Sequence, residues 1–146
     1  MTIALYPGSF SPFTRGHYNI LLKAKKIFGT VVIARGVNLD KPKSEYNLPE
    51  IIVRDFHVIE YNGLLTDCVD EYKALANNDN ITVIRGLRNS TDLKYEMTQY
   101  RYLQDLMPDI QVVSIFCDKE YEHISSSGVR SLSKYGTDKV KDYLIE

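Results

Sequence analysis

The sequence predicts a doubly wound α/β fold, in which helices cover both faces of a parallel sheet. Short β-branched runs alternate with amphipathic stretches along the whole chain. Gly29 and Pro108 follow two of the amphipathic stretches, as glycine and proline commonly do at helix ends. There are no internal repeats or low-complexity tracts, and 146 residues suit one core. We therefore expect one domain over residues 1–146.

The expected strands and helices follow each other in regular order. Strands are predicted at residues 2–6, 30–35, 56–61, 80–84 and 110–116, and helices at 16–28, 64–76, 91–106, 126–134 and 137–145. The strands are rich in Val, Ile and Thr, which is typical of strands buried in a parallel sheet. The first helix carries Ile20, Leu21 and Ala24 on one face, the pattern of a helix packed on a sheet. A helix between successive strands indicates a Rossmann-like arrangement.

Composition and charge exclude several classes of function. The chain is 44% hydrophobic and 25% charged, and its formal net charge of −1 argues against a nucleic-acid surface. Cys68 and Cys117 lack paired or metal-ligand spacing, so we expect buried thiols in a reducing compartment. Met1 leads directly into a strand, and no apolar stretch is long enough to span a membrane. We expect a cytoplasmic protein that binds neither membranes nor nucleic acid.

The first candidate site lies where the first strand turns into the first helix, in YPGSFSPFTRGHYNILL (residues 6–22). A helix N-terminus offers unpaired N–H groups and the positive end of the helix dipole, which together attract anions. Gly8 and Gly16 let a ligand approach the backbone, and His17 falls in the first helical turn. This pattern indicates phosphate binding, although a strand, a Gly/Pro turn and a helix also open many α/β domains without a ligand.

The second candidate site is IRGLRNSTDLKYEM (residues 84–97), which follows a β-branched run. Arg85 and Arg88 lie beside a glycine at the carboxyl end of a strand, where open α/β sheets bind their ligands. Two guanidinium groups three residues apart suit phosphate recognition. The alternative is that the two arginines form ion pairs with Asp92 and Glu96.

The third candidate site is HISSSGVRSLSKYG (residues 123–136). Ser125, Ser126 and Ser127 offer hydroxyl groups at the start of a helix, and Arg130 lies one turn further on. Arg130 is therefore expected close enough to share an anion with the helix amides. The alternative is ordinary helix capping, for which one serine would suffice.

Together the three segments resemble the bacterial phosphopantetheine adenylyltransferases, within a superfamily of nucleotidyltransferases. YPGSFSPFTRGH is similar to the family's Y-P-G-T-F-D-P-x-T-x-G-H, and ISSSGVR to its I-S-S-S/T-x-V-K/R. These two motifs mark the superfamily. RGLRNSTDLKYEM is similar to R-G-L-R-x-x-x-D-F-E-Y-E-x, which is much more specific to this family. The resemblance extends from about Thr2 to Tyr135.

The resemblance implies transfer of an adenylyl group from ATP to 4′-phosphopantetheine, with Mg²⁺ bound by ATP and no dedicated metal ligands in the protein. It also implies a homo-oligomer, usually a hexamer. By matched position His17, Lys41 and Arg88 would be catalytic, and Ser9, Lys41, Leu65 and Arg85 would bind the acceptor. The ATP site would comprise Ser9, Phe10, Thr14, His17, Gly86, Leu87, Arg88, Glu96, Tyr121, Ser125, Ser126, Ser127 and Arg130.

The chain departs from the family pattern mainly on the acceptor side. About fifteen residues separate Lys41 from the third strand, so the helix expected there either shrinks to a turn or is remodelled. Leu103 and Gln104 replace an Asn-Arg pair, and Ser11 stands where Asp is usual. Two alternatives therefore stay open. One is a related transferase with another phosphorylated acceptor such as nicotinamide mononucleotide, and the other is a catalytically idle nucleotide-binding domain.

Overall fold

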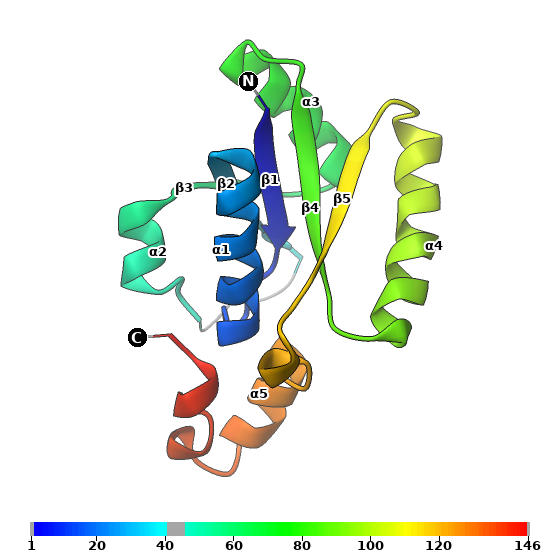
Figure 1. The fold of residues 1–146 in the computed structure, drawn as a ribbon. Coiled ribbons are helices and arrows are strands. Elements are labelled where there is room, and N and C mark those ends of the chain that lie inside the picture. The colour runs from blue at the N-terminus through cyan, green and yellow to red at the C-terminus, as the bar shows by residue number, and fades with distance from the viewer. Residues whose placement is uncertain (1, 41–45, 146) are drawn as a thin grey trace.

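Five parallel strands form a single sheet in the order β3-β2-β1-β4-β5 (Figure 1). The computed structural model describes residues 2–40 and 46–145. The chain runs outward from β1 through β2 to β3, then crosses to the other side of β1 for β4 and β5. The strands are β1 (Ile3–Gly8), β2 (Thr30–Gly36), β3 (His57–Tyr61), β4 (Ile81–Leu87) and β5 (Gln111–Phe116). The predicted doubly wound parallel sheet is confirmed, and its order reverses between β1 and β4.

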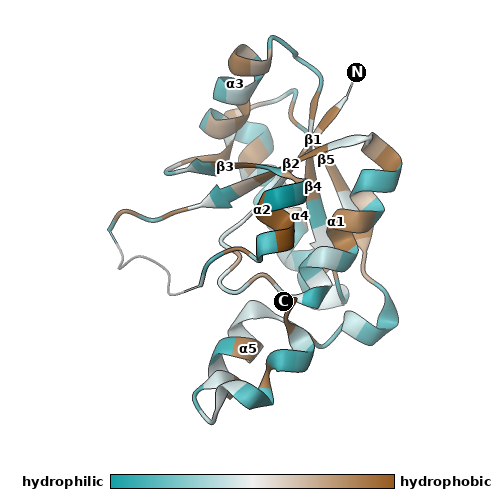
Figure 2. Cartoon of the chain, turned by 90° about the vertical axis from the view of Figure 1, so that its left-hand side faces the viewer, coloured by the Kyte–Doolittle hydropathy of each residue, from teal (hydrophilic) through white to brown (hydrophobic). Residues whose placement is uncertain are grey.

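Helices cover both faces of the sheet because successive strand residues point to opposite sides. The helices are α1 (Arg15–Phe28), α2 (Glu50–Asp55), α3 (Leu65–Ala76), α4 (Ser90–Leu106) and α5 (Ser126–Ser133). Side chains of α1 and α2 pack with Ala4 and Tyr6 in one core, whereas α3 and α4 pack with Ile3 and Leu5 in a second core. Seen from the side, α1 and α3 lie on opposite faces of the sheet, with α5 below (Figure 2).

Three local features set the position of α1, the helix that carries the first motif. Thr14 caps its N-terminus, and Gly29 ends it with a φ of 67°, a left-handed value that suits glycine. Gly86 of β4 lets α1 pack closely on the sheet, because a Cβ atom there would lie 2.9 Å from the Ile20 side chain. The start of α1 is thus held close to the ends of β1 and β4.

Three sequence predictions need correction. Residues 137–145 do not form an α-helix but two 3₁₀ turns, Thr137–Lys139 and Lys141–Tyr143. Strand β4 continues through Leu87 instead of ending at Ile84, because its pairing with β5 extends to that residue. Cys68 is buried as expected, but Cys117 is only partly buried. The segment before β3 is shortened as expected, and its helix α2 has six residues.

None of the helices in the described residues is both long enough and apolar enough to cross a membrane.

Candidate active site

A cavity of about 380 Å³ opens at the carboxyl ends of β1 and β4, where the strand order reverses. This is the place at which open α/β sheets bind their ligands. All three candidate segments of the sequence contribute to its wall. The wall includes Gly8, Ser9, Phe10, Thr14, Gly16, His17, Ile20, Arg85, Gly86, Leu87, Arg88, Asp92, Tyr95, Glu96, Cys117, Ile124, Ser125 and Ser126.

His17 is fixed in the cavity wall by a reciprocal cap at the start of α1. The Thr14 hydroxyl accepts a hydrogen bond from the His17 backbone N–H at 3.3 Å. In return, the Thr14 backbone N–H donates to Nδ1 of His17 at 2.9 Å. Because Nδ1 acts as an acceptor, the proton of the neutral imidazole sits on Nε2. The cap therefore selects the tautomer that can donate a hydrogen bond from Nε2.

His17 is neutral at physiological pH. Burial, together with the nearby positive charge of Arg88, lowers its pKa from 6.5 to about 4. The aromatic rings of Phe10 and Phe13 pack against the imidazole, with ring centroids 5.1 and 5.4 Å away. An uncharged imidazole in this position serves as a directed hydrogen-bond donor.

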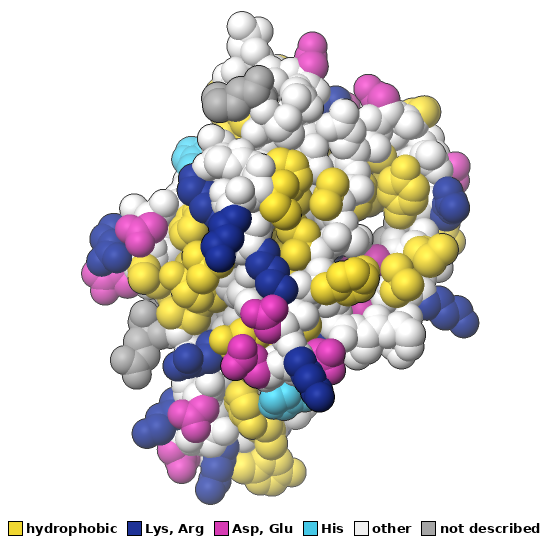
Figure 3. Space-filling view, in the orientation of Figure 1, with side chains coloured by type: hydrophobic (Ala, Val, Ile, Leu, Met, Phe, Trp, Pro, Cys, Tyr) yellow, Lys and Arg dark blue, Asp and Glu magenta, His cyan; other side chains and the backbone are white. Residues whose placement is uncertain are grey.

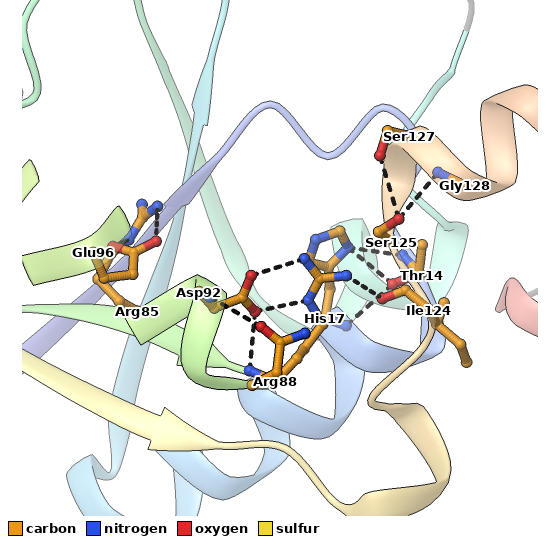
Figure 4. A network of polar contacts seen from close by, with 11 residues as sticks. Thr14, His17, Arg85, Arg88, Asp92, Glu96, Ile124, Ser125, Ser127 and Gly128 are labelled. Atoms are coloured by element: carbon orange, nitrogen blue, oxygen red, sulfur yellow. Dashed lines mark hydrogen bonds and ion pairs between the residues drawn. The ribbon is translucent and has the colours of Figure 1, made fainter. Parts of the chain in front are cut away.

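Arg88 connects two of the three candidate segments (Figure 4). Its Nε and Nη2 donate to the two carboxylate oxygens of Asp92 at 2.8 and 3.0 Å. Its Nη1 donates to the carbonyl oxygen of Ile124 at 3.3 Å, just before the serine run. This pairing holds the guanidinium group close to His17 at the cavity wall.

Arg85 forms a bidentate ion pair with Glu96 of α4. Its Nε and Nη2 lie 2.8 and 2.9 Å from the two carboxylate oxygens. Together with the Arg88–Asp92 pair, this is the ion-pair alternative considered from the sequence. Both arginines nevertheless line the cavity, so each pair holds a guanidinium group at the wall.

The serine-rich segment fastens α5 to the turn after β1. Ser125 caps α5 by accepting a hydrogen bond from the Gly128 N–H at 3.0 Å. The Ser126 hydroxyl donates to the Pro12 carbonyl at 2.8 Å, and Nη1 of Arg130 donates to the Ser11 carbonyl at 2.6 Å. One serine is therefore a cap, while Ser126 and Arg130 bind the turn.

The structure brings most of the predicted site residues together, but not all. The residues in the cavity wall are Ser9, Phe10, Thr14, His17, Arg85, Gly86, Leu87, Arg88, Glu96, Ser125 and Ser126. Leu65 packs on the second core, and Tyr121 on a small core beside α5. Ser127 and Arg130 are exposed and do not line the cavity, and the sharing of an anion by Arg130 and the helix amides stays a prediction. Lys41 lies outside the described residues.

Sequence reasoning missed several residues of the wall. Asp92 was considered only as an ion-pair partner, although its place four residues after Arg88 is the usual spacing for such a pair on a helix. Tyr95 matches the tyrosine of the family motif but was given no role. Cys117 carries no motif signal, because the fold brings it to the cavity from the end of β5. Arg35, which binds the turn after β1 from the neighbouring strand, also gave no signal in the sequence.

The described residues contain no group of three or more His, Cys, Asp or Glu side chains that could hold a metal ion. The two carboxylates in the cavity wall, Asp92 and Glu96, are both paired with arginine.

A cavity at the strand switch, with a capped histidine at a helix N-terminus and two guanidinium groups in its wall, is the arrangement of a nucleotidyltransferase domain. The family model described as cytidylyltransferase-like matches residues 5–132. A phosphopantetheine adenylyltransferase of Clostridium botulinum is 33% identical over 145 residues, covering 93% of this chain and 87% of the relative. One from Prochlorococcus marinus is 35% identical, covering 90% and 85%. The chain belongs to the phosphopantetheine adenylyltransferases of the cytidylyltransferase-like family.

A solved structure supports the fold. A putative nicotinate-nucleotide adenylyltransferase from Vibrio parahaemolyticus aligns with a TM-score of 0.67. The alignment covers 100% of this chain and 95% of that one, at 17% sequence identity.

Proposed function

We propose that the protein transfers the adenylyl group of ATP to 4′-phosphopantetheine, giving dephospho-coenzyme A and pyrophosphate. One observation carries this proposal: relatives named for that activity match nearly the whole chain, and the segment most specific to them, Arg85–Glu96, lines the cavity. Retention of His17 beside two arginines argues against an idle nucleotide-binding domain, because binding alone would not need a donor directed at the reacting phosphate.

The chemistry requires no nucleophilic side chain. A phosphate oxygen of the acceptor attacks the α-phosphorus of ATP, the bond to the β-phosphate oxygen breaks, and pyrophosphate leaves with the electron pair. The attacking oxygen is already anionic, so the protein contributes alignment and charge stabilisation. The Nε2–H of His17 would donate to an α-phosphoryl oxygen, and this bond would strengthen as charge develops. Arg88, held beside His17, would stabilise the same charge.

The resemblance assigns the remaining residues to the two substrates, and we propose these roles here. Arg85, Ser9, Lys41 and Leu65 would bind the acceptor, with Arg85 at its phosphate. The ATP site would use Ser9, Phe10, Thr14, Gly86, Leu87, Glu96 and the residues from Tyr121 to Ser127, with Arg130 acting through the turn that it binds. Because Arg85 is paired with Glu96, an arriving phosphate must share the guanidinium group with that carboxylate or displace it.

The donor set of the cavity fits a metal ion that arrives with ATP. We propose that Mg²⁺ is held by triphosphate oxygens and water, as is common for this ion. Asp92 and Glu96 are engaged by arginines, so neither is positioned as a dedicated ligand. When bound, the ion would neutralise the triphosphate, and the protein side chains would orient it.

The acceptor's long arm has an apolar path beside Arg85. A second, smaller cavity of about 170 Å³ lies between α4 and β5 and shares Arg85 and Glu96 with the first. Its other lining residues are Leu93, Met97, Tyr100, Val112 and Ser114. A mainly apolar groove next to a guanidinium group suits a phosphate carried on a modestly polar chain. This observation favours 4′-phosphopantetheine over a mononucleotide.

The test is pyrophosphate release with saturating ATP and Mg²⁺, measured for two acceptors side by side. We expect turnover with 4′-phosphopantetheine at a high KM. Helix α2 is short, and Leu103, which replaces a polar residue of the family, packs on the second core and offers no polar group to the acceptor. We expect no turnover with nicotinamide mononucleotide. Turnover with the mononucleotide alone would overturn the assignment and establish the other transferase, whereas ATP binding without turnover of either acceptor would support an idle domain.

We further propose a homo-oligomer in the cytoplasm, with a hexamer as the assembly implied by the resemblance. No residue of α4 is buried, although the helix has seventeen residues. Figure 3 shows hydrophobic side chains gathered over β5 and α4. The exposed large hydrophobic residues of these two elements include Leu93, Met97, Tyr102 and Phe116. Exposed hydrophobic side chains gathered in this way commonly mark an interface. Light scattering would report a monomer if this proposal is wrong.

A further inference from the structure

Arg35 stands at the carboxyl end of β2, beside Gly8 of β1 in the sheet register. It is partly buried, and its guanidinium group reaches over the turn that follows β1. Nε donates to the Ser9 carbonyl at 3.0 Å, and Nη2 donates to the Phe10 carbonyl at 3.4 Å. Nη2 also donates to the Tyr46 carbonyl at 2.5 Å. One side chain thus joins two consecutive carbonyls of the cavity turn to the segment that precedes α2.

The two bonds to the turn fix the orientation of its peptide groups. In a trans peptide the C=O and the N–H point in opposite directions. Holding the Ser9 carbonyl toward Arg35 therefore directs the Phe10 N–H away from Arg35. Phe10 has a φ of 50°, a left-handed value that is strained for a residue with a side chain and persists only where the surroundings impose it. Arg35 is part of those surroundings.

The orientation of Phe10 matters because its ring packs against His17. The two rings meet edge to face, with centroids 5.1 Å apart. Phe10 is 2% exposed, so its ring cannot shift without moving its neighbours. A change in the turn would therefore alter how the imidazole is placed at the cavity wall. Arg35 does not line the cavity, and its guanidinium group donates to three backbone carbonyls.

We propose that Arg35 is a positioning residue for adenylyl transfer, which holds the Ser9–Phe10 turn in the form that places His17 against the substrate. The expected effect of Arg35 on kcat rests on the proposed function, whereas its effect on the turn does not. The planar guanidinium fork is needed because three carbonyls in different directions must be reached at once. A lysine at this position would keep the charge but offer a single point of donation.

The test compares Arg35→Met and Arg35→Lys with a matched control, Arg54→Met. Arg54 is an exposed arginine paired with Asp55 and distant from the cavity wall. We expect both Arg35 variants to lose about 10- to 100-fold in kcat, the scale of a small misplacement of catalytic groups, with the control unchanged. We also expect faster amide hydrogen exchange in residues 6–14 and unchanged exchange in residues 65–76. Circular dichroism establishes whether each variant is folded. If Arg35→Met does not fold, the comparison of wild type with Arg35→Lys still decides the question.

A double-mutant cycle with His17→Ala examines the route of the effect. If Arg35 acts through His17, the double variant loses less kcat than the product of the two single losses. Full multiplication of the losses, or lost activity with unchanged exchange, would overturn the inference and assign Arg35 a direct substrate contact. Faster exchange with unchanged activity would overturn it in favour of a purely structural role.

The exchange measurement and the NMR signals of the His17 ring do not depend on the acceptor. If wild-type protein fails to use 4′-phosphopantetheine, the proposed function fails while this inference is still decided. It survives if Arg35→Met speeds amide exchange in residues 6–14 and shifts the NMR signals of the His17 ring, and it fails if either is unchanged.

Discussion

The two proposed substrate regions differ in how their residues are held. In the proposed nucleotide region, at the starts of α1 and α5, Thr14 and Ser125 each cap a helix within their own motif, and Ser126 binds the turn after β1. In the proposed acceptor region, Leu65 and Leu103 lie outside the cavity wall and pack on the second core. The geometry of the first region therefore follows from short motifs, whereas that of the second depends on packing between distant elements.

The sharpest test of the nucleotide region is His17→Ala. The imidazole is neutral and donates from Nε2, so it should matter chiefly for charge that develops in the transition state. We expect kcat for adenylyl transfer to fall about 10²–10³-fold while the ATP dissociation constant changes little. Kinetics and calorimetry on the same preparation measure the two quantities. Turnover within a few-fold of wild type would show that the assigned role is wrong.

Arg85 is assigned to the acceptor and Arg88 to ATP, so separate substitutions of the two arginines can test whether the two substrate regions are distinct. Arg85→Ala should raise the acceptor KM about 10- to 100-fold, and Arg88→Ala should weaken ATP by a similar factor, as expected for the loss of charge-assisted hydrogen bonds. Arg88→Ala also releases the Ile124 carbonyl, which adds to its effect. Steady-state kinetics with each substrate varied in turn distinguishes the two.

Arg54→Ala serves as the control, because its ion pair with Asp55 is exposed. Equal effects of Arg85→Ala and Arg88→Ala on both substrates would show that the comparison between the two regions is mistaken.

The fold was predictable because the periodicity is strong where the chain is buried. Residues Ile81–Ile84 are β-branched and all buried, so their strand was certain to be recognised, whereas its extension to Leu87 depends on pairing with β5. The helix predicted for residues 137–145 was wrong for a similar reason. Leu144 pairs with Thr14 and its carbonyl accepts a bond from Arg15, so tertiary contacts determine the path of this segment.

The candidate site was predictable where one segment supplies both partners of an interaction. The Thr14–His17 cap and the Arg88–Asp92 pair lie within three and four residues, distances that the sequence displays directly. Arg35 could not be found in this way, since its carbonyl partners lie twenty-six, twenty-five and eleven residues away. The bond from Arg130 to the Ser11 carbonyl was likewise not visible in the sequence, because the two residues lie 119 positions apart.

The low pKa of His17 predicts a dependence of stability on pH. The group titrates near 6.5 when unfolded and near 4 when folded, so protonation favours the unfolded chain. The stability due to the neutral imidazole is fully present above pH 6.5 and is lost as the pH falls toward about 4. His17→Asn keeps an acceptor for the Thr14 N–H but does not titrate.

We therefore expect the melting temperature of wild type, relative to His17→Asn, to fall by several degrees between pH 7 and pH 4. His57 and His123 are present in both proteins and cancel in the difference. If the melting temperatures of both proteins changed by the same amount between pH 7 and pH 4, the imidazole would not be held neutral by its surroundings.

The smallest expected effect concerns Leu65, which the resemblance assigns to the acceptor arm and the structure places on the second core. A partly buried leucine contributes through apolar area, so Leu65→Ala should cost part of the roughly 1.5–3 kcal/mol of a fully buried side chain. If it also contacts the arm, the KM for 4′-phosphopantetheine should rise about threefold to tenfold, with kcat and the ATP KM unchanged, because the lost area is then shared between folding and binding. Leu75→Ala is the matched control, since Leu75 lies on the same helix and is 78% exposed. A lower melting temperature with an unchanged acceptor KM would remove Leu65 from the acceptor site and leave it as a core residue alone.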